Sequence, residues 1–245
     1  MTKPAKRALI TGGGSGIGLA IAQKFAENGI GVTIAGRNTA RLKETGLAYL
    51  EIDVTDETSV IEAVKQCGPI DIFVANAGAA ATAPALKTSH QLWDEMIAVN
   101  LTSVYLCARE AIPQMVDRGW GRFIAIASTA SLKAYAYTGA YAAAKHGVIG
   151  WVRTLAIELA KTGVTSNAIC PGFTDTAMVQ NSIETIVQKT GLTKDQALQA
   201  LVKDNPMGRL IKPVEIAQTA LWLASDDAAA INGQAIAVDA GETAS

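Results

Sequence analysis

Short apolar runs rich in β-branched residues alternate with stretches of helical periodicity along most of this chain. Strands separated by helices need crossover connections, which give a parallel sheet with helices on both faces. The sequence therefore predicts an α/β fold of the Rossmann type, a doubly wound three-layer sandwich with a parallel sheet of about seven strands. We expect strands at residues 7–11, 31–36, 47–53, 70–76, 122–128, 164–170 and 234–239.

Helical periodicity marks the connections between those strands. The connection before residue 47 is unusually brief, and the irregular segment 172–212 contains two weak helical patterns, near 182–189 and 193–204. A long segment of this kind is typical of a lid over a site. No repeat or linker divides the chain, so we expect one domain over residues 1–245 that includes this lid. The expected helices are 16–28, 57–66, 89–99, 101–117, 139–161 and 213–225.

Composition excludes several classes of function. The 245 residues can form one large α/β domain, and 49% hydrophobic with 18% charged residues indicate a compact soluble protein. Lys and Arg (21) balance Asp and Glu (22) without a basic stripe, which argues against nucleic acid as a partner. No signal peptide or membrane span is visible, and three widely spaced cysteines suggest reduced thiols, so we expect a cytoplasmic protein. His90 and His146 lack ligand spacing, so no metal is expected.

The glycine-rich stretch TGGGSGIG, residues 11–18, lies between the first predicted strand and the first helix. A dinucleotide pyrophosphate binds backbone N–H groups at such a helix N-terminus, and glycines let the backbone approach the phosphates. A flexible surface turn is the alternative for a glycine cluster considered alone. The expected cofactor contacts in this loop are Gly12, Gly14, Ser15, Gly16, Ile17 and Gly18.

The end of the second strand discriminates between NAD and NADP. An acidic residue there would bind the ribose hydroxyls of NAD, whereas an arginine would bind the extra phosphate of NADP. The sequence is AGRNTAR, with Arg37, Asn38 and Arg41, and no carboxylate before Glu44. Arg37 can bind a phosphate through charge-assisted hydrogen bonds, which predicts NADP(H) in preference to NAD(H). The alternative is that Arg37 is a solvated loop residue.

Tyr141 and Lys145 are four residues apart on a predicted helix and therefore share one face. An ammonium beside a phenol lowers the phenol pKa from its reference value near ~10, which suits an acid that protonates an alkoxide. Tyr135 and Tyr137 precede the helix and cannot share that face. Ser128 ends the fifth predicted strand, at the sheet edge where doubly wound folds bind ligands, so its hydroxyl could hold a substrate oxygen. Surface pairing and turn formation are the alternatives for these residues.

Together these features resemble the short-chain dehydrogenase/reductase family, from about Arg7 to Gly241. The resemblance covers nearly the whole chain, and its motifs occur in the family's order. The matching motifs are TGGGSGIG (11–18), DV (53–54), NAG (76–78), Asn100, Ser128, YAAAK (141–145) and PGFTDT (171–176).

The resemblance implies a role for each matching residue. Tyr141 resembles the general acid/base, and Ser128 the residue that orients the carbonyl. Lys145 resembles the residue that lowers the tyrosine pKa and binds the nicotinamide ribose, and Asn100 the helix-kinking residue whose carbonyl holds a water in a proton relay. Implied cofactor contacts are Asp53 and Val54 at the adenine, Asn76, Ala77 and Gly78 on the adenine and ribose side, and Pro171, Gly172, Thr174 and Thr176 at the nicotinamide carboxamide.

Two departures from the family pattern concern the tail and one connection. The last strand of family members usually ends in DGG, but here the sequence is DAGETAS (239–245), which puts the contribution of the tail in doubt. The short connection before the third strand puts the edge of the adenine pocket in doubt.

The nearest resemblances are to 3-oxoacyl thioester reductases and polyketide ketoreductases. They imply NADPH-dependent reduction of a 3-oxoacyl thioester, carried by CoA or a carrier protein, in a homotetramer. Arg118 and Lys161 could meet a phosphate-bearing carrier, although solvated surface charge is the simpler explanation. The alternatives are a dehydrogenase of aryl or cyclic secondary alcohols and, from another class, a non-catalytic cofactor-binding scaffold.

Overall fold

The computed structural model describes residues 5–244, and these contain one sheet of seven parallel strands. The strand order is β3-β2-β1-β4-β5-β6-β7, so the chain winds outward from β1 in one direction and then from β4 in the other. This arrangement confirms the predicted fold class. The strands are β1 (Arg7–Thr11), β2 (Gly31–Gly36), β3 (Ala48–Glu51), β4 (Ile72–Ala75), β5 (Gly121–Ile126), β6 (Val164–Pro171) and β7 (Ala235–Val238).

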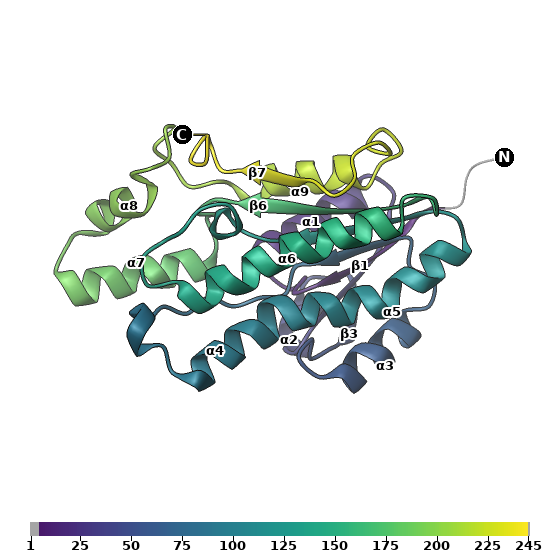
Figure 1. The fold of residues 1–245 in the computed structure, drawn as a ribbon, viewed down its shortest axis with the longest axis horizontal. Coiled ribbons are helices and arrows are strands. Elements are labelled where there is room, and N and C mark those ends of the chain that lie inside the picture. The colour runs from purple at the N-terminus through teal and green to yellow at the C-terminus, as the bar shows by residue number, and fades with distance from the viewer. Residues whose placement is uncertain (1–4, 245) are drawn as a thin grey trace.

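Helices cover both faces of the sheet (Figure 1). On one face lie α3 (Glu57–Cys67), α5 (Ser103–Asp117) and α6 (Gly139–Glu158), and on the other α1 (Gly16–Glu27) and α9 (Pro213–Leu223). The central strands are buried on both faces because alternate residues enter different cores. Phe73 and Phe123 stack in the α5–α6 core with ring centroids 5.8 Å apart, whereas their neighbours Ile72 and Ile124 pack on the α1–α9 side.

Two segments deviate from the expected helices. The predicted helices 89–99 and 101–117 form one continuous helical segment, in which α4 (His90–Ile97) passes through a π-helical turn, η2 (Ala98–Thr102), into α5. Helix α6 ends at Glu158 rather than at residue 161, and Gly163 then adopts a left-handed φ of 78° before β6. Glycine reaches that conformation without a steric penalty, which lets the chain reverse into the strand.

The remaining elements lie at the ends and connections of the sheet. The brief connection between β2 and β3 is α2 (Thr39–Glu44), as expected, and it begins at Asn38, whose side chain accepts a hydrogen bond from Arg41 N. The segment after β6 contains α7 (Ala177–Thr190) and α8 (Lys194–Val202), which extend beyond the sheet at one end of the molecule (Figure 1). Two short 3₁₀ helices are η1 (Ala85–Lys87) and η3 (Thr129–Ser131). Within residues 5–244, no helix has both the length and the apolar character that crossing a bilayer requires.

Candidate active site

The predicted motifs meet at the carboxyl edge of the sheet. All seven described strands are parallel, so the segments that follow β1, β4, β5 and β6 leave the sheet on the same side. These segments carry the glycine loop, Asn76, Ser128 and Gly172. Residues that are more than 150 positions apart in the sequence thus form one site because of the sheet topology.

The glycine loop has a shape that only glycines allow. Gly12 has a φ of 65°, and a Cβ added to Gly18 would lie 2.4 Å from the Gly12 carbonyl oxygen and 2.4 Å from Asn76 Nδ2. Ser15 begins α1 without a side-chain cap, and the first turn of the helix has no acidic residue. The helix therefore offers unpaired N–H groups at its positive end, which is the arrangement that fits a pyrophosphate.

Asn76 fastens the glycine loop to β4. Its side-chain Nδ2 donates to the carbonyl oxygens of Thr11 (2.9 Å) and Gly12 (3.2 Å). The Thr11 hydroxyl in turn accepts hydrogen bonds from the N–H groups of Asn76 (3.0 Å) and Ala77 (3.1 Å). The main role of the Asn76 side chain is thus to support the backbone of the glycine loop. A direct contact of Asn76 with the cofactor would be secondary.

Arg37 lines a cleft of about 490 Å³ next to the end of β2. The register of the sheet places Glu51 beside Gly36, so a carboxylate that is distant in sequence enters the same cleft. Asp53 also lines it, with its Oδ1 accepting hydrogen bonds from Thr55 N (2.9 Å) and Oγ1 (2.7 Å). The two Thr55 hydrogen bonds, and to a smaller degree the charge of Arg37, lower the pKa of Asp53. The cleft therefore combines one cation with several acids.

Ser128 and Tyr141 are brought together by the return of α6 across the end of β5. The Ser128 oxygen accepts a hydrogen bond of 3.1 Å from Ala130 N, and the Ser128 hydroxyl also hydrogen-bonds with Tyr141. Burial raises the pKa of Tyr141, and its hydrogen bond with Ser128 opposes that shift. The phenol therefore keeps its proton at neutral pH.

Lys145 is buried near Tyr141. Its Nζ lies 5.8 Å from the centroid of the Tyr141 ring and donates a hydrogen bond of 2.8 Å to the carbonyl oxygen of Ile126. The side chain is only 4% exposed, and burial lowers the pKa of Lys145 to about 8. Burial raises the pKa of both the tyrosine and the cysteine neighbours of Lys145, so a lowering of the Tyr141 pKa by the Lys145 charge stays a prediction.

Asn100 sits in the π-helical turn and is fully buried. Its Nδ2 donates to the carbonyl oxygens of Ala79 (2.8 Å) and Met96 (3.1 Å), and its Oδ1 accepts from Ala79 N (3.2 Å). A Cβ added to Gly78 would lie 2.8 Å from Asn100 Oδ1 and 3.7 Å from Lys145 Nζ. Asn100, Gly78 and Lys145 are thus neighbours, as the motifs predict.

The segment after β6 returns to the glycine loop. The Thr174 backbone bridges to Ile211, and its hydroxyl donates to the Gly172 carbonyl oxygen at 2.9 Å. Thr176 begins α7, and its methyl group would lie 3.2 Å from a Cβ at Gly16. The predicted residues 171–176 therefore pass directly over the loop that fits a pyrophosphate.

Arg118 and Lys161 are not part of this site. Both lie three residues before a strand begins, Arg118 before β5 and Lys161 before β6, and therefore at the amino edge of the sheet. The Arg118 guanidinium donates to the Ile70 carbonyl oxygen and, at 3.1 Å, to Gln114 Oε1. This position, at the edge opposite the candidate site, favours the explanation of Arg118 and Lys161 as surface charges over contact with a carrier.

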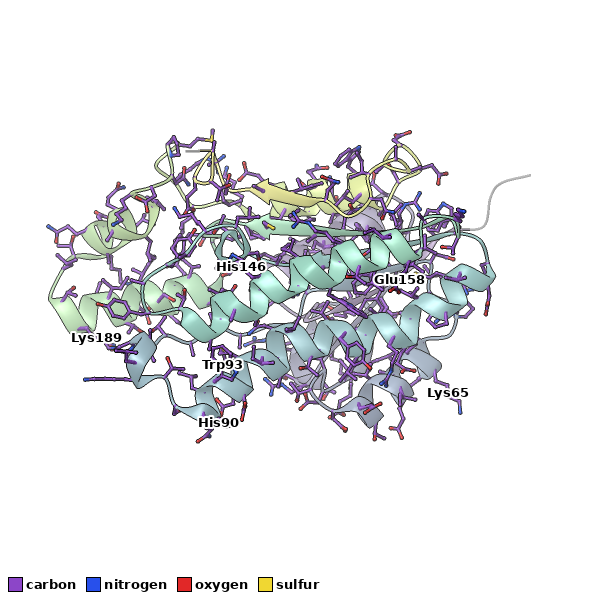
Figure 2. All side chains as sticks on the ribbon, viewed as in Figure 1. Lys65, His90, Trp93, His146, Glu158 and Lys189 are labelled. Atoms are coloured by element: carbon purple, nitrogen blue, oxygen red, sulfur yellow. The ribbon has the colours of Figure 1, made fainter. Side chains whose placement is uncertain are left out.

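The described residues contain no group of three or more His, Cys, Asp and Glu side chains that could hold a metal ion. His90 and His146 lie on different helices, α4 and α6 (Figure 2). His90 Nδ1 pairs with Asp94 at 2.8 Å, and His146 Nδ1 lies 2.9 Å from the Ala142 carbonyl oxygen. Both rings are thus engaged within their own helices.

Sequence reasoning missed a polar cluster beside the site. Glu242 is buried in contact with Tyr135 and Lys133, and the Tyr135 hydroxyl also lies 2.7 Å from Thr129 Oγ1. The only signal in the sequence was the departure DAGETAS from the pattern of the family tail. Cys170 is a second missed neighbour, since it is fully buried and close enough to Lys145 for each to influence the pKa of the other.

Comparison with known proteins finds related reductases and dehydrogenases over nearly the whole chain. A sequence model described as enoyl-(acyl carrier protein) reductase matches residues 12–243. The D-beta-hydroxybutyrate dehydrogenase of Rhizobium meliloti (strain 1021) is 37% identical over 98% of this chain and 99% of that protein. The 3-oxoacyl-[acyl-carrier-protein] reductase of Mycobacterium tuberculosis (strain CDC 1551 / Oshkosh) is 37% identical over 97% of this chain and 92% of that protein.

Solved structures agree over nearly the full length. An actinorhodin polyketide ketoreductase variant crystallised with NADPH superposes with a TM-score of 0.91, at 32% identity, over 99% of this chain and 98% of that one. Levodione reductase superposes with a TM-score of 0.92, at 30% identity, over 98% of each chain. With its motifs, sheet order and matches in agreement, the chain belongs to the short-chain dehydrogenase/reductase family, whose members bind a nicotinamide cofactor.

Proposed function

We propose that this oxidoreductase, which acts on ketones or secondary alcohols, reduces a 3-oxoacyl thioester of CoA or a carrier protein to the 3-hydroxyacyl product, with NADPH as cofactor. The observation that carries the proposal is the convergence of Ser128, Tyr141 and the buried Lys145 at the edge of the sheet beside the glycine loop. The names of two of the sequence relatives support the same substrate class, because they specify a β-hydroxy acid and a 3-oxoacyl group.

In this proposal, Tyr141 is the acid that protonates the carbonyl oxygen. Its raised pKa keeps the phenolic proton in place until negative charge develops on the substrate oxygen. The Ser128 hydroxyl, which hydrogen-bonds with Tyr141 in this structure, would donate to the same substrate oxygen and orient the carbonyl. The nicotinamide cofactor supplies the hydride when bound. Lys145 and Asn100 would have supporting roles. Lys145 would contact the nicotinamide ribose, and Asn100 shapes the helical turn in which it lies.

The proposed cofactor contacts line the same edge. Gly12, Gly14, Ser15, Gly16, Ile17 and Gly18 would hold the pyrophosphate, and Asp53, Val54, Ala77 and Gly78 the adenine and ribose side. Asn76 would act through the glycine loop. Pro171, Gly172, Thr174 and Thr176 would contact the carboxamide. We propose the segment 172–212, with α7 and α8, as the lid over this site.

The preference for NADPH depends on Arg37. Its exposed guanidinium is the only cation among the side chains that line the described cleft, where Asn38 follows it at the start of α2. Glu51 and Asp53 oppose this preference, because carboxylates repel a ribose phosphate. We propose that Arg37 prevails because it is free to move toward the phosphate, whereas Asp53 is held by Thr55.

A second candidate is a dehydrogenase of aryl or cyclic secondary alcohols. The specific observation in its favour is the similarity to levodione reductase, at a TM-score of 0.92. The same three residues would perform that reaction, and only the shape of the pocket would differ. We also propose that the protein is cytoplasmic. We further propose a homotetramer, because Tyr105 and Ile157 leave apolar surface exposed on α5 and α6.

The test is the initial rate of cofactor oxidation with acetoacetyl-CoA, with NADPH and NADH measured side by side. Fast turnover with NADPH alone supports both parts of the proposal. Turnover of cyclic or aryl ketones in place of the thioester would replace the first candidate by the second. Turnover that prefers NADH would show that Arg37 does not bind a phosphate.

A further inference from the structure

The C-terminal tail folds back against the site after β7. The buried Asp239 organises it, with Oδ1 accepting from Gly241 N at 3.0 Å and Oδ2 accepting from Thr243 N at 2.8 Å and Thr243 Oγ1 at 2.6 Å. Ala240 and Gly241 both have positive φ, at 56° and 90°. This tight turn directs the Glu242 side chain inward, where it is only 4% exposed.

Glu242 is bound by the loop that precedes α6. The Tyr135 hydroxyl donates to Glu242 Oε1, and Lys133 Nζ lies 3.4 Å from the same oxygen. A buried carboxylate is costly unless it is paired and hydrogen-bonded, and here one donor and one cation meet that need. The same Lys133 lies 3.7 Å from Asp204, just beyond α8, so it also connects the loop to the segment proposed as the lid.

The loop between residues 129 and 138 is the whole connection between Ser128 and the helix that carries Tyr141. At its start, Thr129 follows Ser128 directly, and its Oγ1 lies 2.7 Å from the Tyr135 hydroxyl. At its end, the Tyr135 carbonyl oxygen accepts a hydrogen bond from Thr138 Oγ1 at 2.9 Å. Thr138 is the N-cap residue, directly before α6. Tyr135 therefore contacts both ends of the connection, and its hydroxyl is held by Glu242.

Residues that directly follow β6 also lie against Tyr135 and Glu242. The Tyr135 ring packs edge-on against Phe173, with centroids 6.0 Å apart. A Cβ at Gly172 would lie 3.3 Å from Glu242 Oε2. The part of the tail around Gly241 lies beside the turn that follows α8, where a Cβ at Gly241 would lie 3.4 Å from the Pro206 ring. The Glu242 carboxylate thus lies at the meeting point of the loop, the end of β6 and the tail.

We propose that Glu242 is a positioning residue for catalysis: through Tyr135 it fixes the 129–138 loop and thereby the placement of Ser128 relative to Tyr141. The inference rests on the catalytic roles proposed for those two residues. A displacement of about 1 Å in a catalytic group can lower the rate by as much as 10²-fold. A residue that fixes the distance between Ser128 and Tyr141 therefore affects kcat. We expect it to act without touching the cofactor, because the polar partners of Glu242, which are Tyr135 and Lys133, lie in the loop and are not among the proposed cofactor contacts.

The kinetic test compares Glu242→Ala, Glu242→Gln and Tyr135→Phe with the wild type in the full-length protein. Glu158→Gln, at an exposed position on α6 (Figure 2), is the matched control. We expect Glu242→Ala to lower kcat about 10-fold or more with an unchanged KM for NADPH. Glu242→Gln keeps an acceptor for the Tyr135 hydroxyl, so it should recover kcat to within about 3-fold of the wild type.

The two partners should act as a unit. The double variant Glu242→Ala/Tyr135→Phe is expected to be no slower than the slower single variant, because either change removes the same hydrogen bond. Effects on kcat that multiply would overturn the proposal. An unchanged kcat together with a lowered melting temperature would also overturn it, since that result describes a merely structural contact.

Hydrogen–deuterium exchange tests the positioning device without turnover. In Glu242→Ala, amides of residues 129–138 should exchange at least about 5-fold faster, while those of α1 stay unchanged. If the wild type reduces no ketone, the proposed function fails, yet faster exchange confined to this loop still supports the link from Glu242 to the loop. Unchanged exchange would overturn that link. Should Glu242→Ala fail to fold, Glu242→Gln and Tyr135→Phe provide the same comparison.

Discussion

Lys145 Nζ donates a hydrogen bond of 2.8 Å to the carbonyl oxygen of Ile126 and so connects α6 to the end of β5, two residues before Ser128. The lysine is buried beside this neutral acceptor, and burial lowers its pKa to about 8. A buried ammonium that lacks a counter-charge lowers the stability of the folded state.

The stability of the protein should therefore depend on pH through Lys145. Its pKa is about 8 in the folded protein and near its ordinary value of 10.5 when unfolded, so between these values the unfolded chain binds more protons. The free energy of unfolding of the wild type relative to Lys145→Met should then rise from pH 8 to pH 10.5, by on the order of 3 kcal/mol. Urea denaturation at several pH values measures this difference. A difference in the free energy of unfolding between the wild type and Lys145→Met that does not change with pH would contradict the prediction.

Tyr141→Phe removes the proposed acid while keeping the ring. We expect kcat to fall by about 10² to 10⁴-fold, because that is the range a positioned general acid contributes. The affinity for NADPH, measured by fluorescence titration, should remain. Tyr49→Phe removes a hydroxyl at a partly exposed position on β3 and should leave kcat unchanged. Normal activity of Tyr141→Phe in the cell would instead support a non-catalytic scaffold.

Arg37→Ala tests the choice of cofactor. Loss of a charge-assisted hydrogen bond to the ribose phosphate should raise the KM for NADPH about 10-fold or more, with little change for NADH. The ratio of kcat/KM values for the two cofactors is the measurement. Glu51→Gln should shift that ratio in the opposite direction, because it removes a carboxylate from the same cleft. An unchanged ratio in Arg37→Ala would show that its side chain remains solvated.

Gly18→Ala tests the fit of the glycine loop. The added Cβ would lie 2.4 Å from the Gly12 carbonyl oxygen, so the loop or α1 must shift. We expect a loss of about 1–3 kcal/mol in the free energy of unfolding, together with weaker cofactor binding. Gly139→Ala is the control, because a Cβ there meets no atom within 4 Å, and its effect on stability should stay below about 1 kcal/mol. Equal effects of the two changes would contradict the close approach described for Gly18.

Ile157→Glu tests the proposed tetramer. Ile157 is 79% exposed on α6, on the surface where we expect another subunit to pack. A carboxylate there should convert the tetramer into smaller species, because a buried unpaired charge destabilises an interface. Light scattering after size-exclusion chromatography measures the mass. Ile61→Glu, at a partly exposed position on α3, should leave the mass unchanged. A wild type that is already monomeric would refute the proposal.

The arrangement of the strands and the edge that holds the site followed from the sequence. Parallel order comes from the alternation of strands with helices, and that order places Asn76, Ser128 and Gly172 on one side of the sheet. The spacing of Tyr141 and Lys145 likewise predicted that they would be near neighbours on α6. These features depend on local patterns and on chain direction, both of which a single sequence contains.

The features that could not be predicted depend on contacts between distant residues. Glu242 and Tyr135 are 107 positions apart, and no local pattern connects a carboxylate in the tail to a tyrosine before α6. The direction of the Tyr141 pKa shift depends on burial, which spacing on a helix does not specify. Glu51 enters the cleft of Arg37 only because β3 pairs with β2 in a particular register.

The hydroxyl of Thr11 accepts hydrogen bonds from two successive N–H groups of Asn76 and Ala77, while the Asn76 amide holds the backbone of the glycine loop in return. These hydrogen bonds tie the ends of β1 and β4 to each other. In the proposal that the segment 172–212 is a lid, the cofactor would enter and leave past this outer segment, whose Thr176 lies against the same loop. Substitutions in that segment should then change the rate of cofactor release.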